Sequence, residues 1–147
     1  MRNIIVFLAI LAAFSFSYSA DKAAKNEWVS FQVRLKDKTT KQGKENALLI
    51  SLHPKEGIHI NLTPPISIRF DSNDAFRIDI ALVLPKNPKN AYLDTSKNIE
   101  QEFTVSKNAK AGSLTIKGVL TYYYCSDAEG WCSKFKQPFE VPVKITK

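Results

Sequence analysis

The sequence is poor in the residues on which most enzyme sites depend. It has only two cysteines, two histidines and five glycines among 147 residues. It contains no glycine-rich phosphate loop, no Gly-x-Ser-x-Gly elbow and no His-Glu-x-x-His pair. A zinc site needs about four ligands, and the spacing of His53, His59 and the cysteines fits no zinc pattern. We therefore expect no metal and no cofactor.

Long apolar runs and helical periodicity are also missing, except at the beginning of the chain. There Arg2 precedes an apolar run over residues 4–16, and Ser17 and Ser19 place small residues at positions −3 and −1 of a cleavage site. This pattern predicts a signal peptide over residues 1–19, with a buried N-terminal strand as the alternative. Residues 20–147 then form a single exported domain, periplasmic or secreted, with no stable membrane insertion.

Basic residues outnumber acidic ones, but their pattern does not indicate nucleic-acid binding. One of the 21 basic residues lies in the signal peptide, so the mature chain has 20 basic and 14 acidic residues and a net charge of +6. The lysines are scattered, with four around the turn at residues 36–44 and three around the turn at residues 86–97, and arginine is scarce. A nucleic-acid reader interleaves arginines and aromatics along one face. We interpret the lysines as solvated loop charge and expect no nucleic-acid partner.

Period-two alternation of apolar residues, which is typical of half-buried strands, recurs along the mature chain. The runs cover residues 28–35, 48–52, 58–62, 66–70, 76–84, 103–105, 114–124 and 139–146, and residues 36–45 form a polar turn. About eight short strands predict an all-β, immunoglobulin-like β-sandwich, with a closed barrel as the alternative. Pro142 lies on the outward face of the last run, which indicates an edge position or a bulge.

The two cysteines flank a short loop between the last two predicted strands. Six residues separate Cys125 from Cys132, and facing strands or a tight loop can bring them within disulfide distance. An exported protein with an even cysteine count is expected to pair them. Closing so small a ring lowers the conformational entropy of the unfolded chain, which stabilises the folded state by about 2.5 kcal/mol. The pair is therefore either a structural staple or a redox couple.

The residues between the cysteines affect how such a couple reacts. Asp127 and Glu129 place negative charge beside the thiols, which raises a thiol pKa and slows attack by this protein's own thiolates. A partner's thiolate can still attack the disulfide. Trp131 can shield one sulfur or pack beneath the ring. These features favour a passive acceptor or donor of electrons over a fast nucleophile.

Two further segments can contribute to a site at the cysteines. Residues 85–98 form the longest polar connection and contain one aromatic residue, Tyr92. Loops of that length in compact domains are often functional. His59 and Asn61 lie on the face of their predicted strand opposite the isoleucines. They are either polar groups beside the thiols or simply exposed strand residues.

Several segments of the chain carry a resemblance to a known family. They are residues 55–61, 82–85, 111–116 and 124–128 and the pair Trp131-Cys132. They resemble the N-terminal periplasmic domain of the DsbD thiol:disulfide interchange proteins, and the likeness extends over residues 47–145. It implies an immunoglobulin-like sandwich whose cysteine pair relays electrons. The implied partners are thioredoxin-fold proteins and a DsbD-type membrane reductase.

The resemblance implies roles for individual residues. Cys125 and Cys132 become the redox pair, with Cys125 forming the mixed disulfides. Residues 85–98 become a cap loop in which Tyr92 shields the disulfide. Three departures stand against the likeness. His59 and Asn61 replace tyrosines, the family's cysteine loop is one residue shorter, and the chain ends without the membrane-spanning and thioredoxin-like parts.

Two functional hypotheses follow. The first is an exported thiol–disulfide exchange domain, with oxidoreductase activity, that relays electrons through Cys125 and Cys132. Its active-site neighbours are His59, Asn61, Tyr92, Asp127, Glu129 and Trp131. The second hypothesis is a non-catalytic β-sandwich that binds a protein partner and uses the disulfide as a structural staple.

Overall fold

The computed structural model describes residues 25–147, and for Asp79 and Ile80 it describes the backbone alone. The signal peptide predicted over residues 1–19 lies outside this range. Nine strands make up the fold: β1 (Val29–Leu35), β2 (Thr39–Lys41), β3 (Glu45–Pro54), β4 (Ile58–Asn61), β5 (Ser67–Phe70), β6 (Phe76–Val83), β7 (Ile99–Val105), β8 (Gly112–Ser126) and β9 (Trp131–Thr146). No helix in this part of the chain is long and apolar enough to cross a membrane.

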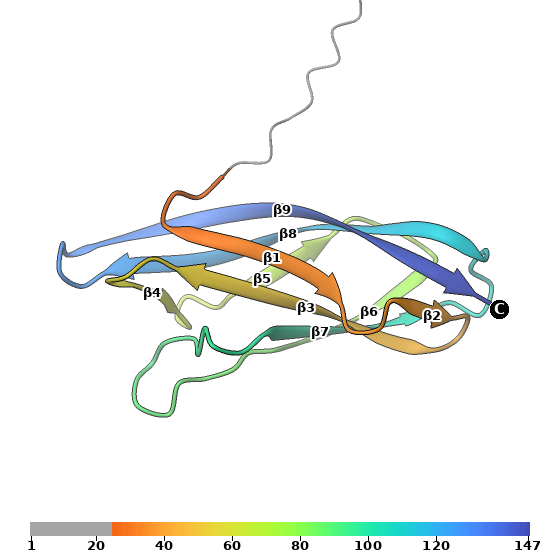
Figure 1. Ribbon diagram of the computed structural model, residues 1–147, viewed down its shortest axis with the longest axis horizontal. Helices are drawn as coiled ribbons and strands as arrows, with labels where there is room; N and C mark the ends of the chain where they lie inside the picture. The colour runs from red at the N-terminus through yellow and green to blue at the C-terminus, as the bar shows by residue number, and fades with distance from the viewer. Residues whose placement is uncertain (1–24) are drawn as a thin grey trace, which may run out of the picture.

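The strands form two sheets that pack as a β-sandwich (Figure 1). The four-stranded sheet has the order β1-β3-β7-β6. The five-stranded sheet has the order β2-β9-β8-β4, and β5 also pairs with β8. The predicted all-β sandwich is therefore confirmed. The alternative prediction, a closed barrel, is wrong because the strands form two separate sheets.

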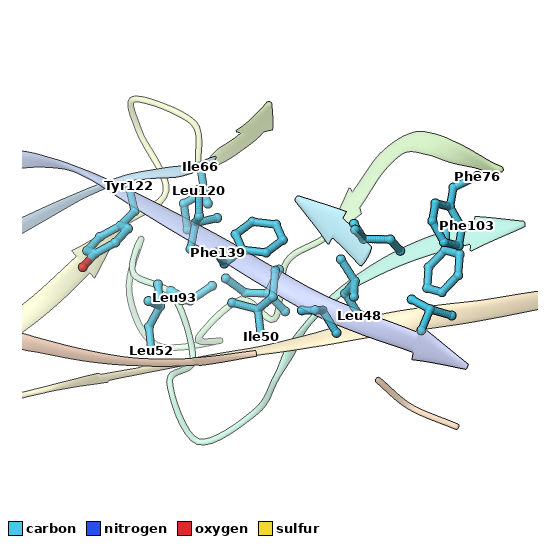
Figure 2. Close-up of a cluster of buried hydrophobic side chains, with 14 of the residues drawn as sticks. Leu48, Ile50, Leu52, Ile66, Phe76, Leu93, Phe103, Leu120, Tyr122 and Phe139 are labelled. Atoms are coloured by element: carbon cyan, nitrogen blue, oxygen red, sulfur yellow. The ribbon is translucent and has the colours of Figure 1, made fainter. Parts of the chain in front are cut away.

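Apolar side chains from both sheets fill the space between them (Figure 2). The largest fully buried side chains are Tyr122, Phe103, Leu48, Ile50, Leu52, Ile60, Ile99, Leu120, Val29, Val105 and Val143. Strands alternate the direction of their side chains, so one face of each sheet supplies this core. At one end of the core, Asn26 Nδ2 donates a 2.9 Å hydrogen bond to the Tyr122 hydroxyl. Burial raises the pKa of Tyr122 to about 12.

Several strands, such as β3 and β7, extend beyond their predicted ends, and three strands differ from the sequence prediction in other ways. Residues 36–45, expected to be a polar turn, contain β2, whose three residues pair in parallel with the end of β9. β9 begins at Trp131 rather than at residue 139. The prediction missed its first half because Ser133 and Gln137 take inward positions where apolar residues were expected. In β6 the register shifts between Ile78 and Leu82, which interrupts the predicted alternation. Short or polar strands of this kind leave little apolar signal in the sequence.

β8 and β9 form one long antiparallel hairpin that carries both cysteines. Its pairing is continuous from Gly112↔Ile145 to Ser126↔Trp131. Residues 127–130 make the turn, in which Gly130 adopts a φ of 69° and donates a 2.9 Å hydrogen bond to the Ser126 carbonyl. Glycine takes this left-handed conformation without steric cost. We call the side of the five-stranded sheet that points away from the core its outer face.

β9 has a neighbour on only one side along most of its length. β2 pairs with residues 144–146 alone, whereas β8 pairs with the whole strand. Among the described strands, residues 131–143 therefore form a sheet edge. An edge tolerates Pro138 and Pro142, which cannot donate to a ladder. The edge position predicted from Pro142 is confirmed, and it leaves Cys132 on an open side of the sheet.

Candidate functional site

The Cys125–Cys132 disulfide closes the end of the β8–β9 hairpin on the outer face. The two cysteines are direct cross-strand partners, with Cα atoms 4.1 Å apart. A separation this short resembles that of a non-hydrogen-bonded antiparallel pair, in which side chains approach most closely. The predicted disulfide is therefore present, as a link between paired strands and not within a loose loop.

The two cysteines differ in exposure. Cys125 is 3% exposed, whereas Cys132 is exposed. Cys125 lies on β8, an inner strand of its sheet, with His59 of β4 directly beside it. Cys132 lies on the edge formed by β9. An outside thiolate thus has easier access to Cys132, the opposite of the order implied by the family resemblance.

An amide contacts the buried sulfur. Asn61 lies opposite Tyr123 in the β4–β8 ladder, and its Nδ2 donates a 3.0 Å hydrogen bond to Cys125 Sγ. Its Oδ1 is buried and has no hydrogen-bond partner among the described residues. Leaving a buried amide oxygen unpaired costs free energy. Packing alone therefore does not explain why an asparagine occupies this position. The amide gives Cys125 a donor that can stabilise a thiolate.

Three side chains from separate segments meet beside the disulfide. The rings of His59 and Tyr92 stack with centroids 3.8 Å apart. The Tyr92 hydroxyl donates a 3.2 Å hydrogen bond to Asp127 Oδ2, and His59 Nδ1 lies 3.5 Å from the same oxygen. Desolvation raises the pKa of Tyr92, and the hydrogen bond and the charge of Asp127 raise it further. The cluster joins β4, loop 85–98 and the hairpin turn.

Loop 85–98 has a fixed path along β4. The Leu93 N–H donates a 2.9 Å hydrogen bond to the Ile60 carbonyl, and the Leu93 side chain is buried in the core. The loop closes back on its first residue where the Asp94 N–H donates a 2.9 Å hydrogen bond to the Pro85 carbonyl. These contacts place Tyr92 over His59. Its ring therefore lies beside the disulfide, where it stacks on the imidazole of His59.

Trp131 packs its side chain against two other aromatic rings. It pairs with Ser126 at the base of the turn, and its ring packs edge-on against Tyr124 and at a tilt against Trp28, with centroids 5.8 and 5.5 Å apart. Its Nε1 donates a hydrogen bond to Glu129. The ring thus packs against Tyr124 and Trp28, and its expected role at the disulfide stays a prediction.

An open cleft of about 420 Å³ borders the disulfide. Its walls are His59, Asn61, Thr63, Ala91, Tyr92, Cys125, Ser126, Asp127, Gly130, Trp131 and Cys132. Of the predicted neighbours, only Glu129 lies outside these walls. Thr63 and Ala91 had no signal in the sequence, because their place in the cleft depends on the paths of two loops. Within residues 25–147, no three His, Cys, Asp or Glu side chains gather as metal ligands would.

Comparison with known proteins leaves both the fold and the function to be argued from the residues of this chain. No family model and no curated protein matches the sequence. A chain of the Coh-OlpA cohesin–dockerin complex from Clostridium thermocellum is 17% identical, with a TM-score of 0.49 over 80% of this chain and 99% of that chain. The GAE domain of yeast GGA1 is 14% identical, with a TM-score of 0.44 over 81% and 95%. With TM-scores below 0.5 and identities below 25%, neither likeness carries an argument about this chain.

Proposed function

We propose that this domain exchanges its Cys125–Cys132 disulfide with thiols of thioredoxin-fold proteins that enter the cleft. The observation that carries the proposal is the asymmetry of the pair. Cys132 is exposed on a sheet edge, while the sulfur of buried Cys125 accepts a hydrogen bond from Asn61. Fast exchange needs an accessible sulfur to attack and a stabilised sulfur to leave.

The reaction takes two steps. A partner thiolate attacks Cys132 Sγ, the S–S bond breaks, and its electron pair remains on Cys125 Sγ as a thiolate. The partner's second thiolate then attacks the mixed disulfide and releases Cys132 as a thiolate. The partner's dithiol is oxidised to a disulfide, this pair gains two electrons, and protons from solvent neutralise the thiolates. Oxidation of the reduced pair by another partner is the reverse sequence.

Asn61 and the cluster around Tyr92 have different roles in this scheme. The Asn61 amide lies 3.0 Å from Cys125 Sγ, where it can hold the negative charge that develops on the leaving sulfur. Tyr92 stacks on His59 and bonds to Asp127 at the rim of the cleft. Its ring restricts entry, which corresponds to the cap that the resemblance to the DsbD domain implies. That resemblance also supports thioredoxin-fold partners and a membrane reductase as the electron source.

A second candidate function uses the same cleft without exchange. Cys125 is 3% exposed, and the disulfide links two strands that are already paired. Both facts are typical of a structural staple. The domain then binds a protein partner through the cleft, and the sulfur pair only stabilises the hairpin. Structural disulfides have reduction potentials below about −300 mV, whereas exchange-active ones lie higher.

Trapping separates the two candidates. The oxidised protein is mixed with a thioredoxin variant that keeps only its attacking cysteine, and the linked peptides are mapped by mass spectrometry after acid quenching. We expect a mixed disulfide at Cys132 and a free thiol at Cys125. A disulfide that stays intact in the native state, and reacts only after unfolding, contradicts exchange and favours the staple.

Two single-thiol variants test which sulfur is attacked. In Cys125→Ser only the exposed thiol remains, and in Cys132→Ser only the buried one. Mixed with thioredoxin activated by thionitrobenzoate, Cys125→Ser should form a covalent complex and Cys132→Ser should not. Complex formation through Cys125 alone would preserve exchange but show that the sulfurs have the opposite roles.

A further inference from the structure

The two sheets differ in the sign of their charge. The strands of the five-stranded sheet contain a single acidic residue, Glu140, whose carboxylate lies 2.7 Å from Lys117 Nζ. The same strands contain six exposed basic residues: Lys41, Arg69, Lys117, Lys134, Lys136 and Lys144. The strands of the four-stranded sheet contain two arginines and four acidic residues. The basic outer face is therefore not merely a consequence of the positive net charge.

The basic residues closest along the strand to the disulfide are Lys134 and Lys136. They follow Cys132 on the same face of β9 at distances of roughly 7 and 13 Å, given about 3.3 Å per residue. Lys134 Nζ lies 5.7 Å from the centroid of the Tyr123 ring. Among the described residues, neither lysine forms a salt bridge with a carboxylate. Both charges are therefore available to a partner.

The hairpin turn on the other side of the disulfide is acidic. Asp127 and Glu129 are both exposed, and Asp127 lines the cleft. The disulfide thus lies between an acidic turn and a basic strand. A charged partner that approaches Cys132 is attracted on one side and repelled on the other. Such a pattern fixes the orientation of an encounter as well as its rate.

We infer that Lys134 and Lys136 form a docking surface for a protein that carries acidic side chains beside its reactive thiol. The inference rests on the proposed exchange function, and it adds the chemistry of the partner. The acidic side chains of the partner lie over β9 while its thiolate faces Cys132. A partner with basic residues at that position is repelled by the same lysines.

Two synthetic peptides test the inference, each with one cysteine and differing only in flanking glutamates or flanking lysines. Rates of reduction of the Cys125–Cys132 disulfide are measured at several ionic strengths by mass spectrometry of acid-quenched samples, which counts the protein molecules that carry the linked peptide or two free thiols. Each rate is divided by the rate of that peptide with a small uncharged disulfide, which removes differences in thiol reactivity. We expect the acidic peptide to react about tenfold faster at low salt and the difference to shrink as salt screens the charges.

Two double variants with the same change in net charge decide whether position matters. Lys134→Glu with Lys136→Glu should reverse the preference between the peptides. Lys41→Glu with Lys144→Glu alters the far end of the same face and should leave the preference in place. Equal effects of both variants, or no effect of the first, would overturn the inference.

Two further outcomes keep the inference separate from the exchange function. If neither peptide reduces the disulfide, the exchange proposal fails, and the peptides with serine in place of cysteine are titrated by fluorescence anisotropy. A preference for the acidic peptide that depends on Lys134 and Lys136 then supports docking, and its absence overturns it. If the first double variant loses only its binding to phosphatidylglycerol vesicles, the surface serves a membrane and the inference is wrong.

Discussion

The centre of the sandwich and the tip of its longest hairpin are built by opposite means. In the centre, side chains such as Leu48 and Phe103 are fully buried and apolar. At the tip, His59, Asn61 and Asp127 gather polar atoms around a disulfide. Figure 1 shows this tip, where β8 turns into β9, projecting past the ends of β1 and β3. The centre is stabilised by the exclusion of water from apolar side chains, whereas the polar side chains of the tip line a cleft that is open to solvent.

This difference predicts that stability and thiol reactivity rest on separate residues. β8 links the two regions, because Leu120 and Tyr122 face the core while Tyr123 and Cys125 face outward. Alternation along a strand places neighbours in sequence on opposite sides of the sheet. Substitutions on one side should therefore alter the free energy of unfolding, and substitutions on the other should alter thiol chemistry.

The largest effect is expected in the centre. Phe103 is 0% exposed, and its ring packs edge-on against Phe76 with centroids 5.7 Å apart. Phe103→Ala should lower the free energy of unfolding by about 3–5 kcal/mol, because it leaves a cavity between the sheets. Urea denaturation measures the change. The exposed Val83→Ala, on the neighbouring strand, is the control and should change stability little.

The Phe103 variant also tests the separation of the two regions. In the population that remains folded, its disulfide should react with a small thiol at the wild-type rate. A markedly changed rate under native conditions would show that core packing controls the site, and the two regions would no longer be independent.

A smaller effect, confined to the tip, is expected from Asn61. In a Cys132→Ser background Cys125 is the only thiol, and the pH dependence of its alkylation reports its pKa. Removing the 3.0 Å amide contact by Asn61→Ala should raise that pKa by about one to two units, since hydrogen bonds to charged groups contribute roughly 1.5–3 kcal/mol. Asn61→Asp should raise it further, because it adds a negative charge. Thr63→Ala, which lines the same cleft, is the control, and an unchanged pKa in the Asn61 variants would remove the proposed role.

The centre was predictable from the sequence to a degree that the tip was not. Alternation in β1 and β8 assigned the inward residues correctly, since burial of apolar side chains dictates that pattern. The site residues came from local cues, the cysteine spacing and the lone aromatic of loop 85–98. What those cues lacked was the strand order, which makes β9 an edge and β8 an inner strand. Relative exposure of Cys125 and Cys132 depends on that order, whereas the alignment of Lys134 with the disulfide depends on β9 beginning at Trp131, before the predicted start at residue 139.

The smallest effect is expected from Tyr92, where the tip meets solvent. Tyr92→Ala removes both the ring stacked on His59 and the hydroxyl bonded to Asp127, so a small thiol such as dithiothreitol should reduce the disulfide about two- to tenfold faster. That range corresponds to losing one exposed interaction of roughly 0.5–1.5 kcal/mol. Tyr92→Phe keeps the ring and should fall between wild type and Tyr92→Ala if the hydrogen bond to the turn helps to hold the loop. Equal rates for all three proteins would show that the loop does not restrict access to Cys132.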